Sequence, residues 1–294
     1  MITYTQPEVV LKLKAQLGEG AIWHPIDKKL YWVDIEGKLL HVFDPISQKD
    51  KAYDTDERIG TVVPVKSGGV LLALENGISH FDLESGQMKF IIDPEKDKPN
   101  NRFNDGKCDP LGNFWVGSMP LDEKDAVGSV YKISPDFSAQ KMITEVTVSN
   151  GICWSQDCST MYYIDSPTRK IVAYNFNKND ASISNPKVVV TVEDHLGFPD
   201  GMTIDANGML WVALWGGAAV GCWNPITGKL IESIPLPALN VTSCAFGGEN
   251  LNRLFITSAR QGTTPEQLER YPNSGDVFVT EVNVSGVPAC LFGQ

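Results

Sequence analysis

Four short segments of the chain share one arrangement, in which an acidic or amide side chain stands directly before a glycine. They are Glu19-Gly20, Asn104-Asp105-Gly106, Asn150-Gly151 and Asp200-Gly201. Carboxylate and amide oxygens are the ligands that Ca²⁺, Mg²⁺ and Mn²⁺ prefer, and Zn²⁺ also accepts carboxylates. Carboxylates gathered in a confined space would repel one another unless a cation lay between them. The chemistry that these residue types predict is therefore that of a divalent metal site with oxygen ligands, provided the fold brings the segments together.

A single Asp-Gly or Asn-Gly pair is usually just a turn, so the positions of these pairs carry the argument. Each pair lies about 9 to 12 residues before a short apolar strand, and that strand recurs six times along the chain. The six strands are Leu30-Tyr31-Trp32-Val33, Val70-Leu71-Leu72-Ala73, Phe114-Trp115-Val116-Gly117, Met161-Tyr162-Tyr163-Ile164, Leu210-Trp211-Val212-Ala213 and Leu254-Phe255-Ile256-Thr257. Their spacing of 41 to 49 residues is typical of propeller blades.

Turns and strands alternate at short intervals, and long helical periodicity is missing, which is typical of all-β folds. The sequence therefore predicts a single domain over residues 1–294, an all-β, six-bladed β-propeller with four-stranded blades. We expect the N-terminal strand from Val9 to Leu17 to close the ring as the outer strand of the last blade, which removes exposed sheet edges. The alternative is six loosely similar β-meanders in a different all-β fold.

The innermost strands of a propeller run side by side around its axis, so equivalent positions on them meet at one end of the channel. The acidic and amide residues occupy such positions, and the glycines that follow them allow backbones to approach closely there. No histidine occupies these positions, which argues against a histidine-rich zinc site.

The composition narrows the range of partners. A net charge of −11 without any lysine and arginine cluster disfavours nucleic acids and anionic membrane surfaces as partners. We see neither a signal peptide nor an apolar run of membrane-spanning length, and we expect a cytoplasmic protein. The six cysteines are expected to be mostly small buried hydrophobes. Because a closed propeller has no obligatory partner edge, we expect a monomer or a weak homo-oligomer.

Taken together, the motifs resemble the family of senescence marker protein (regucalcin), gluconolactonase and luciferin-regenerating enzyme. The resemblance covers nearly the whole chain, and its strongest pieces are Leu17-Gly18-Glu19-Gly20, residues 101–107, Ser149-Asn150-Gly151, Pro199-Asp200-Gly201-Met202 and residues 242–248. It implies three metal ligands on separate inner strands, which map to Glu19, Asn150 and Asp200. It also implies that Arg102 and Asn104 hold sugar hydroxyls, and the spacing points to Asp122 as a further acidic residue that contacts the sugar.

The resemblance further implies a metal-dependent hydrolase that opens a small sugar lactone, an aldonolactone. One divalent ion (Ca, Zn, Mg, Mn or Fe) would act as a Lewis acid on the lactone carbonyl. Asp200 would serve as general base for the attacking water, and Asp105 would support the site from behind or act as the base instead. A phosphotriesterase or aryl-ester hydrolase stays open as an alternative. So does a calcium-binding regulatory protein without turnover, although the chain has no EF-hand loop.

Overall fold

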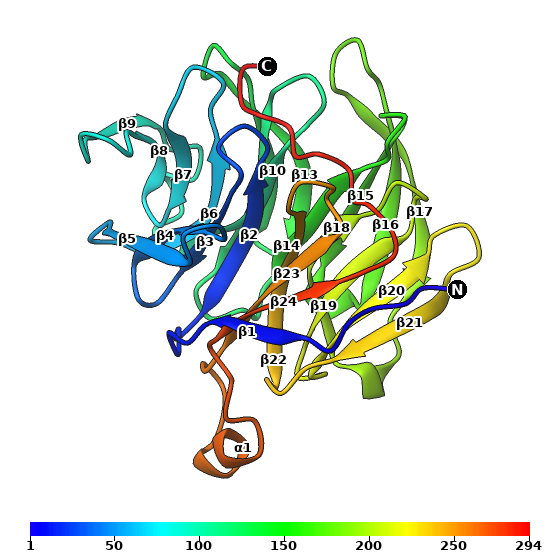
Figure 1. Cartoon of the computed structure of the whole chain (residues 1–294). Coiled ribbons are helices and arrows are strands. Elements are labelled where there is room, and N and C mark those ends of the chain that lie inside the picture. Colours follow the sequence, from blue (N-terminus) through cyan, green and yellow to red (C-terminus); the bar gives the residue numbers. More distant parts are fainter.

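The computed structural model describes residues 1–294 and contains six antiparallel sheets of four strands each (Figure 1). The first blade comprises β2 (Gly18–His24), β3 (Lys29–Asp34), β4 (Leu39–Asp44) and β5 (Lys49–Asp54). The second comprises β6 (Ile59–Pro64), β7 (Val70–Leu74), β8 (Gly77–Phe81) and β9 (Met88–Ile92). The third comprises β10 (Asn101–Cys108), β11 (Phe114–Pro120), β12 (Gly128–Ile133) and β13 (Ala139–Val146).

The fourth blade comprises β14 (Ser149–Trp154), β15 (Thr160–Asp165), β16 (Lys170–Phe176) and β17 (Ile183–Thr191). The fifth comprises β18 (Phe198–Ile204), β19 (Leu210–Trp215), β20 (Ala219–Asn224) and β21 (Lys229–Pro235). The sixth comprises β22 (Asn240–Gly247), β23 (Arg253–Ala259), β24 (Val277–Glu281) and β1 (Glu8–Leu11). The inner strands β2, β6, β10, β14, β18 and β22 contact one another in this order and close a ring. The predicted six-bladed β-propeller is confirmed.

Closure of the ring follows the prediction, with a shorter strand. The N-terminal strand β1 pairs with β24 as the outermost strand of the last blade. It spans Glu8–Leu11 rather than continuing to Leu17. The extended backbone ends before Lys14, whose φ of 54° lies in the left-handed region.

Buried aspartates fasten the turn between the inner and second strands in two blades. Asp205 accepts hydrogen bonds from the backbone N–H of Asn207 and Met209 at 2.9 Å and from Trp211 Nε1 at 3.0 Å. Asp109 makes the equivalent bonds to its turn and to Trp115 Nε1, and both carboxylates are fully buried. One carboxylate thus satisfies a turn and a core tryptophan, so each tryptophan is locked into blade packing.

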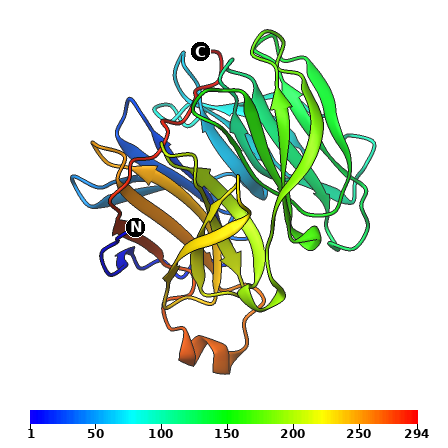
Figure 2. The same cartoon turned by 90° about the vertical axis from the view of Figure 1, so that its right-hand side faces the viewer.

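Short helices and the C-terminal segment complete the chain. A six-residue helix, α1 (Pro265–Arg270), has a capping box at Thr264 and projects from the end of the ring opposite the C-terminus (Figures 1 and 2). Two 3₁₀ turns span Ser166–Thr168 and Asp194–Leu196. No helix of the chain combines the length and apolar character needed to cross a membrane. All six cysteines are free, and four of them are buried.

The segment after β24 crosses the other end of the ring, a path that the sequence pattern did not predict. Gly286 forms a bridge with Asp205 on the fifth blade, and Phe292 forms one with Val65 on the second. Phe292 also stacks on Phe137 with ring centroids 5.8 Å apart. The C-terminal segment therefore spans several blades and ties them together.

Candidate active site

The predicted site residues lie where the inner strands depart from regular pairing. The register shifts between Glu19 and Ile22 in β2, and between Phe103 and Gly106 in β10. The same shift lies between Ser149 and Ile152 in β14 and between Pro199 and Met202 in β18. A β-bulge turns local side chains away from their regular direction. Bulges at equivalent heights are therefore what aims these acidic and amide groups into the channel.

The glycines at the bulges lie where neighbouring strands leave little or no room for a Cβ, as the sequence analysis predicts for the axis. A Cβ on Gly151 would lie 2.6 Å from Met202 Cβ and 2.8 Å from the Asp200 carbonyl oxygen. Gly20 has a φ of 60°, which is strained for residues with a side chain. Glycine therefore lets neighbouring inner strands approach closely beside the site.

Two aspartates at equivalent positions fix the chain just before two of the site residues. Asp34, at the end of β3, accepts hydrogen bonds from the backbone N–H groups of residues 16 and 17, two positions before Glu19. Asp165, at the end of β15, accepts from the N–H groups of residues 147 and 148, just before Asn150. Each carboxylate thereby sets the height at which the following inner strand enters the channel.

One cavity of about 480 Å³ receives five of the predicted residues. Glu19, Arg102, Asn104, Asn150 and Asp200 all line it, and all are at least nine-tenths buried. The other lining residues include Leu17, Ile35, Met119, Glu123, Val148, Ser166, Pro167, Phe198, Trp215 and Gln261. The fold thus collects predicted site residues that are up to 181 positions apart, from Glu19 to Asp200, around one space.

Hydrogen bonds join the arginine to the amides within this cavity. Arg102 Nη1 donates to Asn104 Oδ1 at 2.6 Å and to the Phe103 carbonyl at 3.0 Å. Asn104 Nδ2 donates to Asn150 Oδ1 at 3.1 Å and to the Ser149 carbonyl at 2.7 Å. The pair predicted for sugar binding, Arg102 and Asn104, is therefore held in one hydrogen-bond network with Asn150, which is predicted to bind the metal.

The buried carboxyls are electrostatically costly in their ionised form. Burial, then the negative charge of Asp105, raises the pKa of Glu19 from 4.5 to about 8. Burial and the charge of Glu19 raise the pKa of Asp200 well above its usual range. Burial also raises the pKa of Asp105, and the ammonium of Lys107 opposes that rise. Without a counter-charge, Glu19 retains its proton at neutral pH, and the ionised form of Asp200 is disfavoured.

Two carboxylate oxygens in this cluster have no partner within the protein. Asp200 Oδ1 and Asp105 Oδ2 are buried and accept no hydrogen bond. A buried unsatisfied acceptor is unfavourable by about 1–3 kcal/mol. No three histidine, cysteine, aspartate or glutamate side chains in the chain are grouped to hold a metal ion. A cation here would accordingly use two carboxylates, Glu19 and Asp200, together with the amide oxygen of Asn150.

The structure does not bring Asp122 to this cavity. Its side chain is 57% exposed, lies 4.0 Å from Lys124, and lines a separate surface hollow beside Asn100. The neighbouring Glu123 lines the cavity instead. Burial lowers the pKa of Arg102, and the negative charge of Glu123 opposes that lowering. The backbone explains this difference, because Glu123 has a φ of 58° and closes a turn onto the Pro120 carbonyl.

Several cavity residues had no signal in the sequence pattern. Ser166, Phe198, Trp215 and Gln261 stand in or next to loops, outside the repeated segment that marked the inner strands. Their contribution depends on how loops fold over the ring. Beyond the metal ligands, the sequence analysis assigned roles to Arg102, Asn104, Asp105 and Asp122, and of these four only Arg102 and Asn104 line the cavity.

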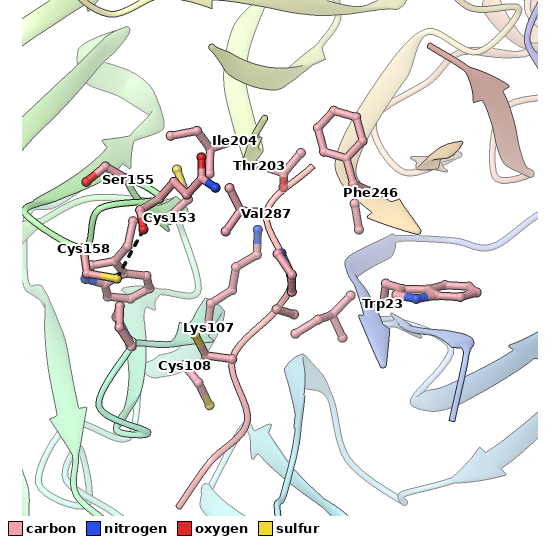
Figure 3. A pocket seen from close by; sticks show the side chains of 18 of the residues that line it. Trp23, Lys107, Cys108, Cys153, Ser155, Cys158, Thr203, Ile204, Phe246 and Val287 are labelled. Atoms are coloured by element: carbon pink, nitrogen blue, oxygen red, sulfur yellow. Dashed lines mark hydrogen bonds between the residues drawn. The ribbon is translucent and has the colours of Figure 1, made fainter. Parts of the chain in front are cut away.

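The other end of the channel holds a smaller and mostly apolar cavity of about 100 Å³ (Figure 3). Its lining residues lie further along β2, β10, β14 and β18, the strands that also carry the charged and amide residues of the large cavity. Lys107 projects into the smaller cavity and donates to the Met202 carbonyl, while Val287 of the C-terminal segment covers this cavity. The large cavity with the charged residues and this small one thus occupy opposite ends of the channel.

Comparison with known proteins places the chain among relatives. Residues 17–260 match the family model described as the SMP-30/Gluconolactonase/LRE-like region. The chain is 36% identical over 273 residues to a Bacillus subtilis protein named "Putative sugar lactone lactonase YvrE", covering 93% of this chain and 94% of that one. It is 37% identical over 291 residues to regucalcin of Xenopus laevis, covering 97% of each chain.

Solved structures agree with this placement. A luciferin-regenerating enzyme superposes with a TM-score of 0.93 at 30% identity, covering 99% of this chain and 100% of that one. A protein of Agrobacterium tumefaciens described as a calcium-binding protein, regucalcin, superposes with a TM-score of 0.94 at 25% identity, covering 99% and 98%. The predicted resemblance is confirmed, and the chain belongs to the SMP-30/gluconolactonase/LRE-like family.

Proposed function

We propose that this protein is a divalent-metal-dependent hydrolase that opens a sugar lactone. The observation that carries the proposal is the convergence of Glu19, Asn150 and Asp200 on one cavity that also holds an arginine–asparagine pair. The family contains proteins named for gluconolactonase and lactonase activity, which supports the reaction class. The ligand set and the base are our own assignment.

The residues fit a hard cation. Two buried carboxyls with raised pKa values need either protons or a positive charge, and Asp200 Oδ1 has no partner in the protein. Glu19, Asn150 and Asp200 would hold the ion through oxygen only, as hard divalent cations prefer. When bound, such an ion supplies Lewis-acid polarisation of the lactone carbonyl.

Substrate binding falls to the polar residues on the third blade. Arg102 uses Nη1 within the protein, which leaves Nε and Nη2 free to donate to sugar hydroxyls. Asn104 fixes the position of this guanidinium through its Oδ1. The substrate contact predicted for Asp122 goes, in our proposal, to Glu123, because Glu123 lines the cavity. A carboxylate there would accept hydrogen bonds from the hydroxyls that Arg102 does not reach.

Asp200 is the general base in this proposal. It would take a proton from the water as the water oxygen bonds to the lactone carbonyl carbon. As the bond between that carbon and the ring oxygen then breaks, Asp200 would return the proton to the ring oxygen, which gives the open hydroxy acid. Asp105, the other candidate, is not among the cavity-lining residues and keeps its free Oδ2 buried. Asp105 would instead add negative charge behind the ligands, which strengthens the preference for a cation.

A regulatory calcium-binding protein without turnover is the competing function. It is favoured by the solved relative that is described as calcium-binding. The same oxygen ligands would serve it, so the two functions differ only in turnover.

The decisive experiment is a panel of five- and six-carbon aldonolactones assayed with chelated protein reloaded with Ca²⁺, Mg²⁺, Mn²⁺, Fe²⁺ or Zn²⁺. We expect hydrolysis that requires metal and that Asp200→Asn abolishes. The matched control Asp50→Asn changes a mostly buried aspartate that pairs with His41 in the first blade, away from the cavity, and should retain activity. If no aldonolactone is hydrolysed with any of these ions, the lactonase proposal is refuted and the regulatory function is favoured.

A further inference from the structure

Ser166 contacts one proposed metal ligand, Asn150, and the residue before another, Asp200, although it lies outside every inner strand. It begins the 3₁₀ turn Ser166–Thr168 after β15, and it is 8% exposed on the wall of the large cavity. Its Oγ donates to the Pro199 carbonyl at 2.6 Å and accepts from Asn150 Nδ2 at 2.8 Å. The hydroxyl therefore connects β14, at Asn150, with β18, at the residue before Asp200.

The direction of these hydrogen bonds is fixed by chemistry at both ends. The Pro199 carbonyl can only accept, so the hydroxyl proton of Ser166 is committed to it. The Ser166 oxygen can then only accept, which requires the NH₂ of Asn150 to face it. At the other end, the guanidinium of Arg102 can only donate, so Asn104 turns its oxygen to Arg102 and its NH₂ to Asn150.

Asn150 is thus oriented from two sides. An asparagine side chain can rotate to exchange its oxygen and nitrogen at little steric cost, and only hydrogen bonds decide between the two orientations. Here Ser166 requires a donor from Asn150, and Asn104 requires an acceptor. The carbonyl oxygen keeps a second lone pair for another partner, whereas the amide nitrogen could bind no cation.

We propose that Ser166 is a positioning residue that holds Asn150 Oδ1 in the orientation needed to bind the cation. This inference rests on the proposed function, since it presupposes that Asn150 is a ligand. Residues that orient metal ligands through hydrogen bonds typically change metal affinity by 10–100-fold when they are removed. Ser166→Ala leaves the NH₂ of Asn150 without its acceptor and permits the reversed amide, which presents N–H groups to the cation.

The test measures Mn²⁺ affinity of chelated protein by titration calorimetry and by the electron paramagnetic resonance signal of free Mn²⁺. We expect Ser166→Ala to weaken binding by about 10–100-fold. The matched control is Ser258→Ala, because the buried Ser258 hydroxyl likewise donates to a carbonyl, that of Asp276, and accepts from an N–H, that of Gly275. The control should bind Mn²⁺ as the wild type does.

Introducing Ser166→Ala into the Asn150→Asp variant distinguishes an effect on the orientation of the side chain at position 150 from general damage to the site. In Asn150→Asp both terminal atoms are oxygens, so the orientation of the side chain no longer matters. Adding Ser166→Ala to Asn150→Asp should therefore change the affinity less than twofold. Equal losses in the two backgrounds, or unchanged affinity in Ser166→Ala alone, would overturn the positioning role.

The outcomes are distinguishable from failure of the proposed function. If wild-type protein binds no divalent cation, the metal site itself is wrong and the role of Ser166 falls with it. If wild-type protein binds the cation and Ser166→Ala binds it equally well, only the positioning role is wrong. Thermal unfolding of each chelated variant identifies any variant that fails to fold. Ser166→Thr keeps the hydroxyl and should therefore bind Mn²⁺ with wild-type affinity, also in the case that Ser166→Ala does not fold.

Discussion

The chelated protein is expected to lose stability as the pH rises through the neutral range, because Glu19 holds a proton in the folded state. The pKa of Glu19 is about 8 in the folded protein against an ordinary value of 4.5. Between these values the folded state binds a proton that the unfolded state does not. Stability contributed by a group of this kind is fully present below pH 4.5 and is lost progressively up to about pH 8.

The size of the effect follows from the pKa difference. Each pH unit within the interval changes the free energy of unfolding by about 1.4 kcal/mol. The interval from 4.5 to about 8 therefore corresponds to a loss of roughly 5 kcal/mol for a group that is fully buried. Asp200 and Asp105 also have raised pKa values, so their contributions have the same sign.

The assay is urea unfolding, followed by tryptophan fluorescence, of chelated wild type and Glu19→Gln at pH 5, 6, 7 and 8. Glutamine cannot ionise, so the difference in the free energy of unfolding, wild type minus variant, isolates Glu19. This difference should fall by several kcal/mol from pH 5 to 8. Saturating divalent cation should remove the loss in the wild type, because the ion stabilises the ionised carboxylates. A wild-type minus variant difference that is constant with pH, or that grows in favour of the wild type, would refute the electrostatic argument.

Three further changes test other parts of the structure. Arg102→Lys should raise KM for a polyhydroxylated lactone about tenfold or more while leaving an unsubstituted lactone little affected, because charged hydrogen bonds contribute about 1.5–3 kcal/mol each; equal effects on both lactones would contradict the sugar-binding role. Asp205→Ala should lower the free energy of unfolding by about 3 kcal/mol, since the turn and Trp211 Nε1 lose their acceptor, without changing Mn²⁺ affinity. Deletion of residues 287–294 should cost about 3–6 kcal/mol of stability, because Leu291 and Phe292 are buried, and calorimetry showing an unchanged unfolding temperature would contradict a stabilising C-terminal segment.

The repeated architecture could be predicted from the sequence because its cause is local. Strands buried on both faces, such as the one containing Trp211, must be apolar, and one such strand recurs in every blade. The acidic or amide residue before a glycine marks the inner strand because close backbone packing excludes a Cβ at positions such as Gly151. Ring closure then brings Glu19 and Asp200 together, which the sequence predicted from equivalent positions alone.

The tertiary structure decided two features of the site, namely which loop residue reaches the cavity and in which direction the hydrogen bonds around Asn150 run. Whether Asp122 or Glu123 reaches the cavity is set by one left-handed residue in a turn, and side-chain periodicity does not describe such turns. The orientation of Asn150 depends on Ser166, whose hydroxyl arrives from a separate turn and is committed by a carbonyl on the next blade. Sequence patterning determines which residues a strand must bury, because burial follows a local period, whereas hydrogen-bond direction arises only when distant segments are assembled.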